Sequence, residues 1–278
     1  MLGGGYTVKP IKIRELELDD GSFKICVVLT SRTKKDLEED LSSFQGKDID
    51  LIEWRVDYMD VPGRNPDAGY LEDLVNIRRM FRDKPLIATF RVKSEGGYHD
   101  MDLRTVLDVR TLLVESGLID AIDIELESIL TKRPEEERRV TEEYADLICN
   151  AKGRDIKVIL SYHDFKGTAE VEDMVKLLKE EEHYGADLAK IAFYAKEGYD
   201  AIKLMKASQE ASLVLSIPHI ALSMGKEGAS SRYMRSESKS ALTYAYVDKS
   251  SAPGQMSLEE LNEFLDQQKK HDHHRNAP

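Results

Sequence analysis

The amino-acid sequence predicts a (β/α)8 barrel, the TIM-barrel form of the α/β class, from three observations. Eight short apolar runs rich in β-branched residues recur along the 278-residue chain. The segments between most of them carry apolar residues at three- and four-residue steps, the spacing of amphipathic helices. Runs that are apolar on both faces and alternate with helices are typical of parallel strands joined by βαβ crossovers. An open, doubly wound sheet is the alternative, but no GxGxxG follows the first run and no GxxxxGK[ST] occurs in the sequence.

The elements are expected in the following order. Residues 1–23 are expected to form an N-terminal β-hairpin closing the bottom of the barrel, because 11–25 alternates apolar and polar residues and contains the turn pair Asp20-Gly21. The expected strands are 24–30, 50–56, 85–91, 119–126, 156–163, 186–194, 219–225 and 241–247. The expected covering helices are 36–44, 71–81, 103–116, 138–151, 171–185 and 258–270. We expect one domain over 1–278, with a polar, aperiodic and flexible tail at 269–278.

Composition narrows the classes of function. Acidic residues outnumber basic ones by 52 to 40, for a net charge of -12, so nucleic acid is not expected as a partner, although a local cation can still bind a small anion. No apolar stretch is long enough to span a membrane and the N-terminus lacks signal-peptide features. Cys26 and Cys149 lie in apolar settings without CxxC spacing, which favours buried free thiols and a cytoplasmic location.

Polar side chains stand in or just after several expected strands, where an apolar core would not place them. In a barrel of this type the reactive groups gather at the carboxyl ends of the strands. Glu53 and Arg55 are two positions apart and therefore share one face of the second strand. The further candidates are Arg91 and Glu95 at the third strand, Asp123 and Glu125 in the fourth, His163 and Asp164 at the fifth, Lys190 in the sixth and Arg232 after the seventh.

Lys190 and His163 are the candidates with the most specific chemistry. Burial disfavours a lysine ammonium, and a neutral amine is what imine formation requires. His163 ends the strand before the lysine strand, and neighbouring strands lie about 5 Å apart, so one pocket can hold both side chains. Glu95 is a natural carboxylate partner for the imidazole. Loops after the last two strands bind anions in many such barrels, which favours Arg232 as a carboxylate clamp.

Each candidate also has a structural interpretation. Lys190 can extend its amine to the barrel rim, and Glu95 can be merely solvated. Glu53 and Arg55 can form an interior ion pair. A metal site is not expected, because His163 and Asp164 are adjacent rather than spaced as ligands and HExxH is absent.

Six ordered motifs between about residues 24 and 262 resemble the type I 3-dehydroquinate dehydratases. They are EWRVD at 53–57, TFR at 89–91 with Glu95 four residues after Arg91, LSYHDF at 160–165, AKIA at 189–192, SMGKEGASSR at 223–232 and SAPGQ at 251–255. The resemblance implies a (β/α)8 barrel without metal or cofactor, a homodimer, and dehydration of 3-dehydroquinate to 3-dehydroshikimate in the shikimate pathway.

The resemblance also implies roles for individual residues. Lys190 is the expected imine-forming lysine, His163 the base that removes a C2 proton, and Glu95 the carboxylate that holds the histidine. Glu53, Arg55 and Arg91 are expected to contact the substrate hydroxyls and the pocket, and Arg232, Ser251 and Gln255 the carboxylate side.

Two other functions remain open from the sequence. A Schiff-base aldolase also uses a barrel lysine but breaks a carbon–carbon bond, and the HDF and SAPGQ motifs favour the dehydratase over it. A catalytically inactive barrel kept as a binding module is disfavoured, because both the lysine and the histidine are present.

Overall fold

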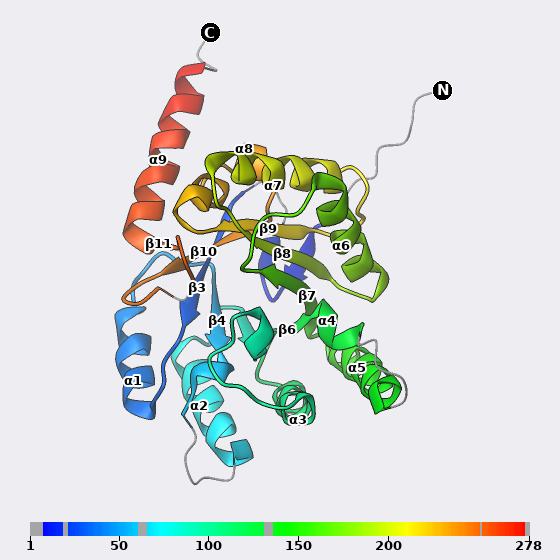
Figure 1. The fold of residues 1–278 in the computed structure, drawn as a ribbon. Coiled ribbons are helices and arrows are strands. Elements are labelled where there is room, and N and C mark those ends of the chain that lie inside the picture. The colour runs from blue at the N-terminus through cyan, green and yellow to red at the C-terminus, as the bar shows by residue number, and fades with distance from the viewer. Residues whose placement is uncertain (1–7, 19–21, 61–65, 131–135, 251, 276–278) are drawn as a thin grey trace.

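The computed structural model describes residues 8–18, 22–60, 66–130, 136–250 and 252–275, and its main feature is a curled parallel sheet with helices outside it (Figure 1). Eight strands match the eight predicted runs: β3 (Lys24–Leu29), β4 (Leu51–Arg55), β5 (Leu86–Thr89), β6 (Ala121–Glu125), β7 (Lys157–Asp164), β8 (Leu188–Tyr194), β9 (His219–Met224) and β10 (Leu242–Tyr246). A two-residue strand, β11 (Met256–Ser257), pairs with β10.

The order of the strands in the sheet confirms the barrel prediction. The hydrogen-bonded order is β11-β10-β3-β4-β5-β6-β7-β8-β9, so strands that follow one another in the chain are neighbours in space. The doubly wound alternative is wrong, because such a sheet reverses its strand order at a switch point. The curl brings the two ends of the sheet together, where the Ala241 N–H donates to the His219 carbonyl at 2.9 Å.

The helices cover the outside of the sheet. The six predicted helices are confirmed as α1 (Lys34–Ser43), α2 (Pro66–Met80), α3 (Leu103–Glu115), α5 (Glu136–Gly153), α6 (Val171–His183) and α9 (Leu258–Arg275). The short helical segments are η1 (Val56–Tyr58), η2 (Lys93–Glu95), α4 (Leu126–Ile129), η3 (Lys226–Arg232) and α8 (Arg235–Ser238). Helix α9 continues to Arg275, beyond the 258–270 that its periodicity predicts.

One covering helix, α7 (Gly198–Ala211), is absent from the sequence prediction. Its buried face is built mainly from small residues such as Ala201, while Tyr199 and Ile202 are 62% and 58% exposed. Large apolar residues therefore lie on the solvent side of α7, which obscures the amphipathic pattern on which the prediction depended.

The N-terminal hairpin closes the bottom of the barrel, as predicted. Strands β1 (Ile11–Ile13) and β2 (Leu16–Leu18) pair antiparallel, and Ile13 and Leu18 are buried against residues at the amino ends of the barrel strands, including Leu51 and Leu188. The hairpin turns at Arg14 and Glu15, and the expected turn pair Asp20-Gly21 lies outside the described residues.

Two apolar layers hold the fold together. One fills the lower barrel, and the other lies between the sheet and its helices. On β8, Leu188 packs in the lower barrel while Ala189 and Ile191 pack outward against the helices. The alternation of a strand therefore turns Lys190 inward, above the apolar floor.

The cysteine prediction is half correct. Cys26 is buried inside the barrel, but Cys149 is exposed on α5, because the apolar residues around it in sequence face the sheet while Cys149 lies on the opposite side of the helix. Among the described helices, none has both the length and the apolar character needed to cross a membrane.

Candidate active site

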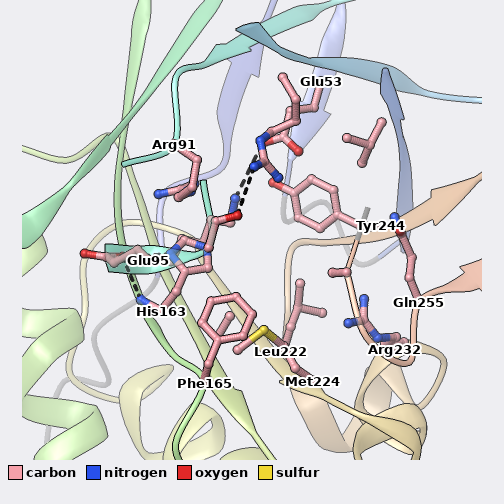
Figure 2. Close-up of a pocket in the computed structure, with 16 residues that line it drawn as sticks. Glu53, Arg91, Glu95, His163, Phe165, Leu222, Met224, Arg232, Tyr244 and Gln255 are labelled. Atoms are coloured by element: carbon pink, nitrogen blue, oxygen red, sulfur yellow. Dashed lines mark hydrogen bonds and ion pairs between the residues drawn. The ribbon is translucent and has the colours of Figure 1, made fainter. Parts of the chain in front are cut away.

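A pocket opens at the carboxyl ends of the barrel strands, and most of the predicted site residues line it (Figure 2). It spans about 590 Å³ when the open solvent at its mouth is included. Its lining includes eight predicted residues: Glu53, Arg55, Arg91, Glu95, His163, Lys190, Arg232 and Gln255. The ninth, Ser251, lies outside the described residues, although its neighbour Ala252 lines the pocket.

Lys190 lies in the floor of this pocket between two carboxylates. Its Nζ atom is 2.9 Å from Asp123 Oδ2 and 3.7 Å from Glu53 Oε1. The same atom lies 4.7 Å from the centre of the Tyr244 ring. The two carboxylates offset part of the cost of burying the ammonium.

Asp123 joins Lys190 to a buried network of charges. Its Oδ1 atom accepts from Arg91 Nη2 at 2.8 Å and from the Ser161 hydroxyl at 2.6 Å. Burial would raise the pKa of Asp123, but the positive charges of Arg91 and Lys190 outweigh it and hold the pKa well below its usual range. Arg91 also donates to Glu125 Oε1 at 2.8 Å. Asp123 is therefore a fixed anion beside the lysine.

His163 and Glu95 form the second part of the site. Residues Ser161 and Lys190 pair across β7 and β8, so His163 lies two residues nearer the mouth than the lysine. Glu95 Oε2 accepts the His163 backbone N–H at 2.9 Å and lies 3.0 Å from ring atom Nδ1. This contact fixes the ring and leaves Nε2 for another partner.

Burial determines the charge of this pair. It raises the pKa of Glu95 to about 9, with repulsion from Glu125 adding to the effect. Burial also lowers the pKa of His163 well below its usual value, and the positive charges of Arg91 and Lys190 act in the same direction. At neutral pH the imidazole is therefore uncharged, the form that a general base requires.

Two glycines allow the loop after β5 to place Glu95. A Cβ atom on Gly97 would lie 2.1 Å from the Arg91 carbonyl oxygen. Gly96 has a φ of 87°, and a Cβ there would lie 2.5 Å from the Phe165 ring. The loop can therefore fold tightly against Arg91 and Phe165, and Glu95 is buried rather than solvated.

Arg55 and Glu53 do not pair with each other, so the interior ion pair considered from the sequence is wrong. Arg55 forms a bidentate pair with the fully buried Asp57, at 2.8 Å for both contacts. Glu53 Oε1 instead accepts the Thr89 hydroxyl at 2.7 Å and lies near Lys190. The chain turns into η1 directly after Arg55, and this turn brings the Asp57 carboxylate to the guanidinium.

Arg232 lies at the opposite side of the pocket from His163, in a segment held by contacts between the last two loops. The Gly225 N–H donates to the Pro253 carbonyl at 2.9 Å, and a Cβ on Gly254 would lie 2.1 Å from the Gly225 oxygen. Arg232 is 2% exposed and has no ion pair with any described carboxylate. Burial lowers the pKa of Arg232 to about 10. This guanidinium is thus placed to receive an anion from the pocket.

The structure adds two residues that the sequence did not single out, Tyr244 and Glu181, and places one that it did, Asp123, beside the lysine. Asp123 had a signal, because alternating acids in IDIE are unusual in a buried strand. Tyr244 had none, because an aromatic residue in ALTYAYV is ordinary for a strand. Glu181 also had none within the acidic run of α6, yet its Oε2 accepts the Lys190 backbone N–H at 2.7 Å. No group of three or more metal-binding side chains occurs in the part of the chain that the structure describes.

The fold and the pocket together define an enzyme of the (β/α)8-barrel class, and comparison with known proteins identifies its family. The family model for type I 3-dehydroquinase matches residues 25–272. The chain belongs to this family.

Individual relatives agree over nearly their whole lengths. The 3-dehydroquinate dehydratase of Bacillus licheniformis is 35% identical over 92% of this chain and 96% of its own. That of Salmonella typhimurium is 33% identical over 93% of this chain and 98% of its own. The crystal structure of a type I 3-dehydroquinate dehydratase from Clostridium difficile, with covalently modified comenic acid, has a TM-score of 0.84 and 30% identity over 95% of this chain and 99% of that one.

Proposed function

We propose that this chain is a hydro-lyase that dehydrates 3-dehydroquinate to 3-dehydroshikimate through an imine at Lys190. The observation that carries the proposal is the placement of the Lys190 amine and the uncharged His163 ring on neighbouring strands around one pocket. Membership of the type I 3-dehydroquinase family supports the dehydratase rather than the aldolase, because the curated relatives that match nearly the whole chain carry the dehydratase name.

The pocket provides a place for each part of the substrate. Arg232, with Gln255 beside it on the lining, binds the carboxylate, because this buried guanidinium has no carboxylate partner among the described residues. Glu53 and Arg55 contact the ring hydroxyls, and Ser251 contributes on the carboxylate side. Arg91 faces the same pocket, but its guanidinium is bonded to Asp123 and Glu125. Its main effect is therefore to hold the carboxylate that pairs with the lysine.

The reaction begins when the Lys190 nitrogen adds to the C3 ketone and water leaves. The protonated imine withdraws electrons from the neighbouring C2 carbon, so the C2 proton becomes removable. His163 takes that proton through Nε2 while Glu95 holds Nδ1. The resulting enamine expels the C1 hydroxyl, which leaves as water with the proton from His163. Hydrolysis of the imine then releases the product and restores the lysine.

Borohydride trapping tests this proposal. Added together with 3-dehydroquinate, borohydride should reduce the imine and leave a mass adduct on the Lys190 peptide. Lys190→Ala should abolish both the adduct and the dehydratase activity. Lys157→Ala is the matched control, because this side chain lies at the amino end of β7 and pairs with the exposed Asp155. Full activity in Lys190→Ala, or a wild-type protein without dehydratase activity, would contradict the proposal.

We further propose that residues 1–278 form one domain, that the chain works as a homodimer and that it acts in the cytoplasm on a small molecule. One nine-stranded sheet takes its strands from Lys24 to Ser257, which supports one domain. Three apolar side chains in or just after α7 are largely exposed: Tyr199 at 62%, Ile202 at 58% and Leu213 at 69%. Their exposure supports burial of the α7 surface in a dimer. Light scattering measures the mass in solution, and a monomer at micromolar concentration would contradict the dimer.

A further inference from the structure

Tyr244, on β10, is a pocket residue with no role in the reaction as described above. Its ring lies beneath the amine of Lys190, with Nζ 4.7 Å from the ring centre. Figure 2 shows the ring on the wall of the pocket, with its hydroxyl end directed toward Glu53. The hydroxyl is buried and has no hydrogen-bond partner among the described residues.

A hydroxyl in this state is not explained by the stability of the protein alone. Buried polar groups are nearly always hydrogen-bonded, and an unpaired one costs free energy. Phenylalanine would fill the same space and make the same ring contacts with Lys190 without that cost. The hydroxyl therefore points to an interaction that forms when the pocket holds a ligand.

The charges around Tyr244 determine what its hydroxyl can do. Burial, followed by the negative charge of Glu53, raises the pKa of Tyr244 well above its usual value. The group therefore keeps its proton throughout the working pH range and acts as a hydrogen-bond donor rather than an acid. The lining residues Val28 and Leu222 have apolar side chains, so they cannot donate a hydrogen bond to a ligand.

We propose that Tyr244 donates a hydrogen bond to the ligand oxygen carried by the carbon that Lys190 attacks. This inference rests on the proposed function. When Nζ bonds to the carbonyl carbon, the π electrons of the C=O bond move to the oxygen, which becomes a hydroxyl. The C–O bond then breaks, and the oxygen leaves as water with two protons from the Lys190 ammonium, while one proton stays on the C=N nitrogen. Tyr244 stabilises the oxygen while it gains negative charge and retains its own proton.

Tyr244→Phe tests this role, because it removes only the hydroxyl. The rate at which borohydride traps the Lys190 imine in a single turnover with 3-dehydroquinate should fall about tenfold, the effect of one hydrogen bond lost in a transition state. The melting temperature should stay the same or rise, because an unpaired buried group has been removed. Tyr184→Phe is the matched control and should change neither quantity, because Tyr184 is an exposed residue directly after α6.

The outcomes separate this inference from the proposed function. A wild-type protein that neither forms the imine nor dehydrates 3-dehydroquinate contradicts the proposed function itself. An active wild type with an equally fast Tyr244→Phe variant overturns only the role of the hydroxyl. A Tyr244→Phe variant that loses thermal stability, with its imine formation as fast as that of the wild type, shows that the hydroxyl is structural and also overturns the inference.

Discussion

At the scale of single residues, the proposed mechanism gives Lys190 and His163 separable steps, and each side chain faces the pocket from its own strand. His163→Ala should still form the imine, since addition of the amine to a ketone does not use the C2 base. Turnover should fall about 100- to 10,000-fold, the usual contribution of a positioned general base. Mass spectrometry after borohydride reduction measures the first effect, and a steady-state assay measures the second.

Lys190→Ala is the control for the His163→Ala experiment, because this variant should lose the borohydride adduct and the turnover together. If His163→Ala also lost the adduct, the histidine would have to assist imine formation.

The pKa of His163 is lowered by burial and by the charges of Arg91 and Lys190. Turnover of the wild type should therefore not decline between pH 8 and pH 6 through protonation of this ring.

The sequence predicts the candidate catalytic residues better than it predicts their partners. Lys190 and His163 lie in short motifs whose strand positions follow from apolar alternation, so their convergence on one pocket is predictable. The pairing of Arg55 with Asp57 instead of Glu53 depends on how the chain turns after β4, which periodicity does not describe. The unpaired state of the Tyr244 hydroxyl is a property of three-dimensional packing and has no signal in the sequence.

At the scale of elements, the segment 90–97, which follows β5 and contains η2, links the path of the backbone to the orientation of His163 through Glu95. Gly97→Ala should disturb this loop, because its Cβ would lie 2.1 Å from the Arg91 carbonyl oxygen. We expect the free energy of unfolding of Gly97→Ala to fall by about 1–3 kcal/mol, the usual cost of adding a methyl group to a site that is already filled. We also expect kcat to fall, because the added methyl group displaces Glu95. Gly153→Ala is the matched control, because a Cβ there has no neighbour within 4 Å. Chemical denaturation and a dehydratase assay measure both effects, and equal behaviour of the two variants would contradict this role of Gly97.

The elements themselves differ in how well their sequences predict them. The eight strands are predictable because parallel strands in a barrel are apolar on both faces. Helix α7 is not, because Tyr199 and Ile202 are apolar residues on its exposed side. The hairpin below the barrel is predictable from the alternation of apolar and polar residues. The position of its turn is not, because Arg14 and Glu15 are not typical turn residues, although Arg14 adopts a φ of 54°.

At the scale of the whole molecule, buried ionisable groups make stability depend on pH in two opposite ways. The pKa of His219 falls from 6.5 to about 4 through burial. The unfolded chain therefore takes up a proton below pH 6.5 that folded His219 does not accept, and this contribution to stability is lost as the pH falls toward 4. Glu95 has the opposite sign, because its pKa is raised from 4.5 to about 9.

Folded Glu95 retains a proton that the unfolded chain has released, so stability should decline as the pH rises from about 4.5 to about 9. The melting temperature should therefore be higher near pH 6 than near pH 9. Glu95→Gln, which keeps the shape but cannot ionise, should remove part of this decline. We expect the variant to be more stable than the wild type by at least about 1.4 kcal/mol at pH 8, the equivalent of one pKa unit, and equally stable at pH 4.5. Calorimetry at both pH values measures this difference. A gain of the same size at pH 4.5 would show that ionisation of Glu95 is not its cause.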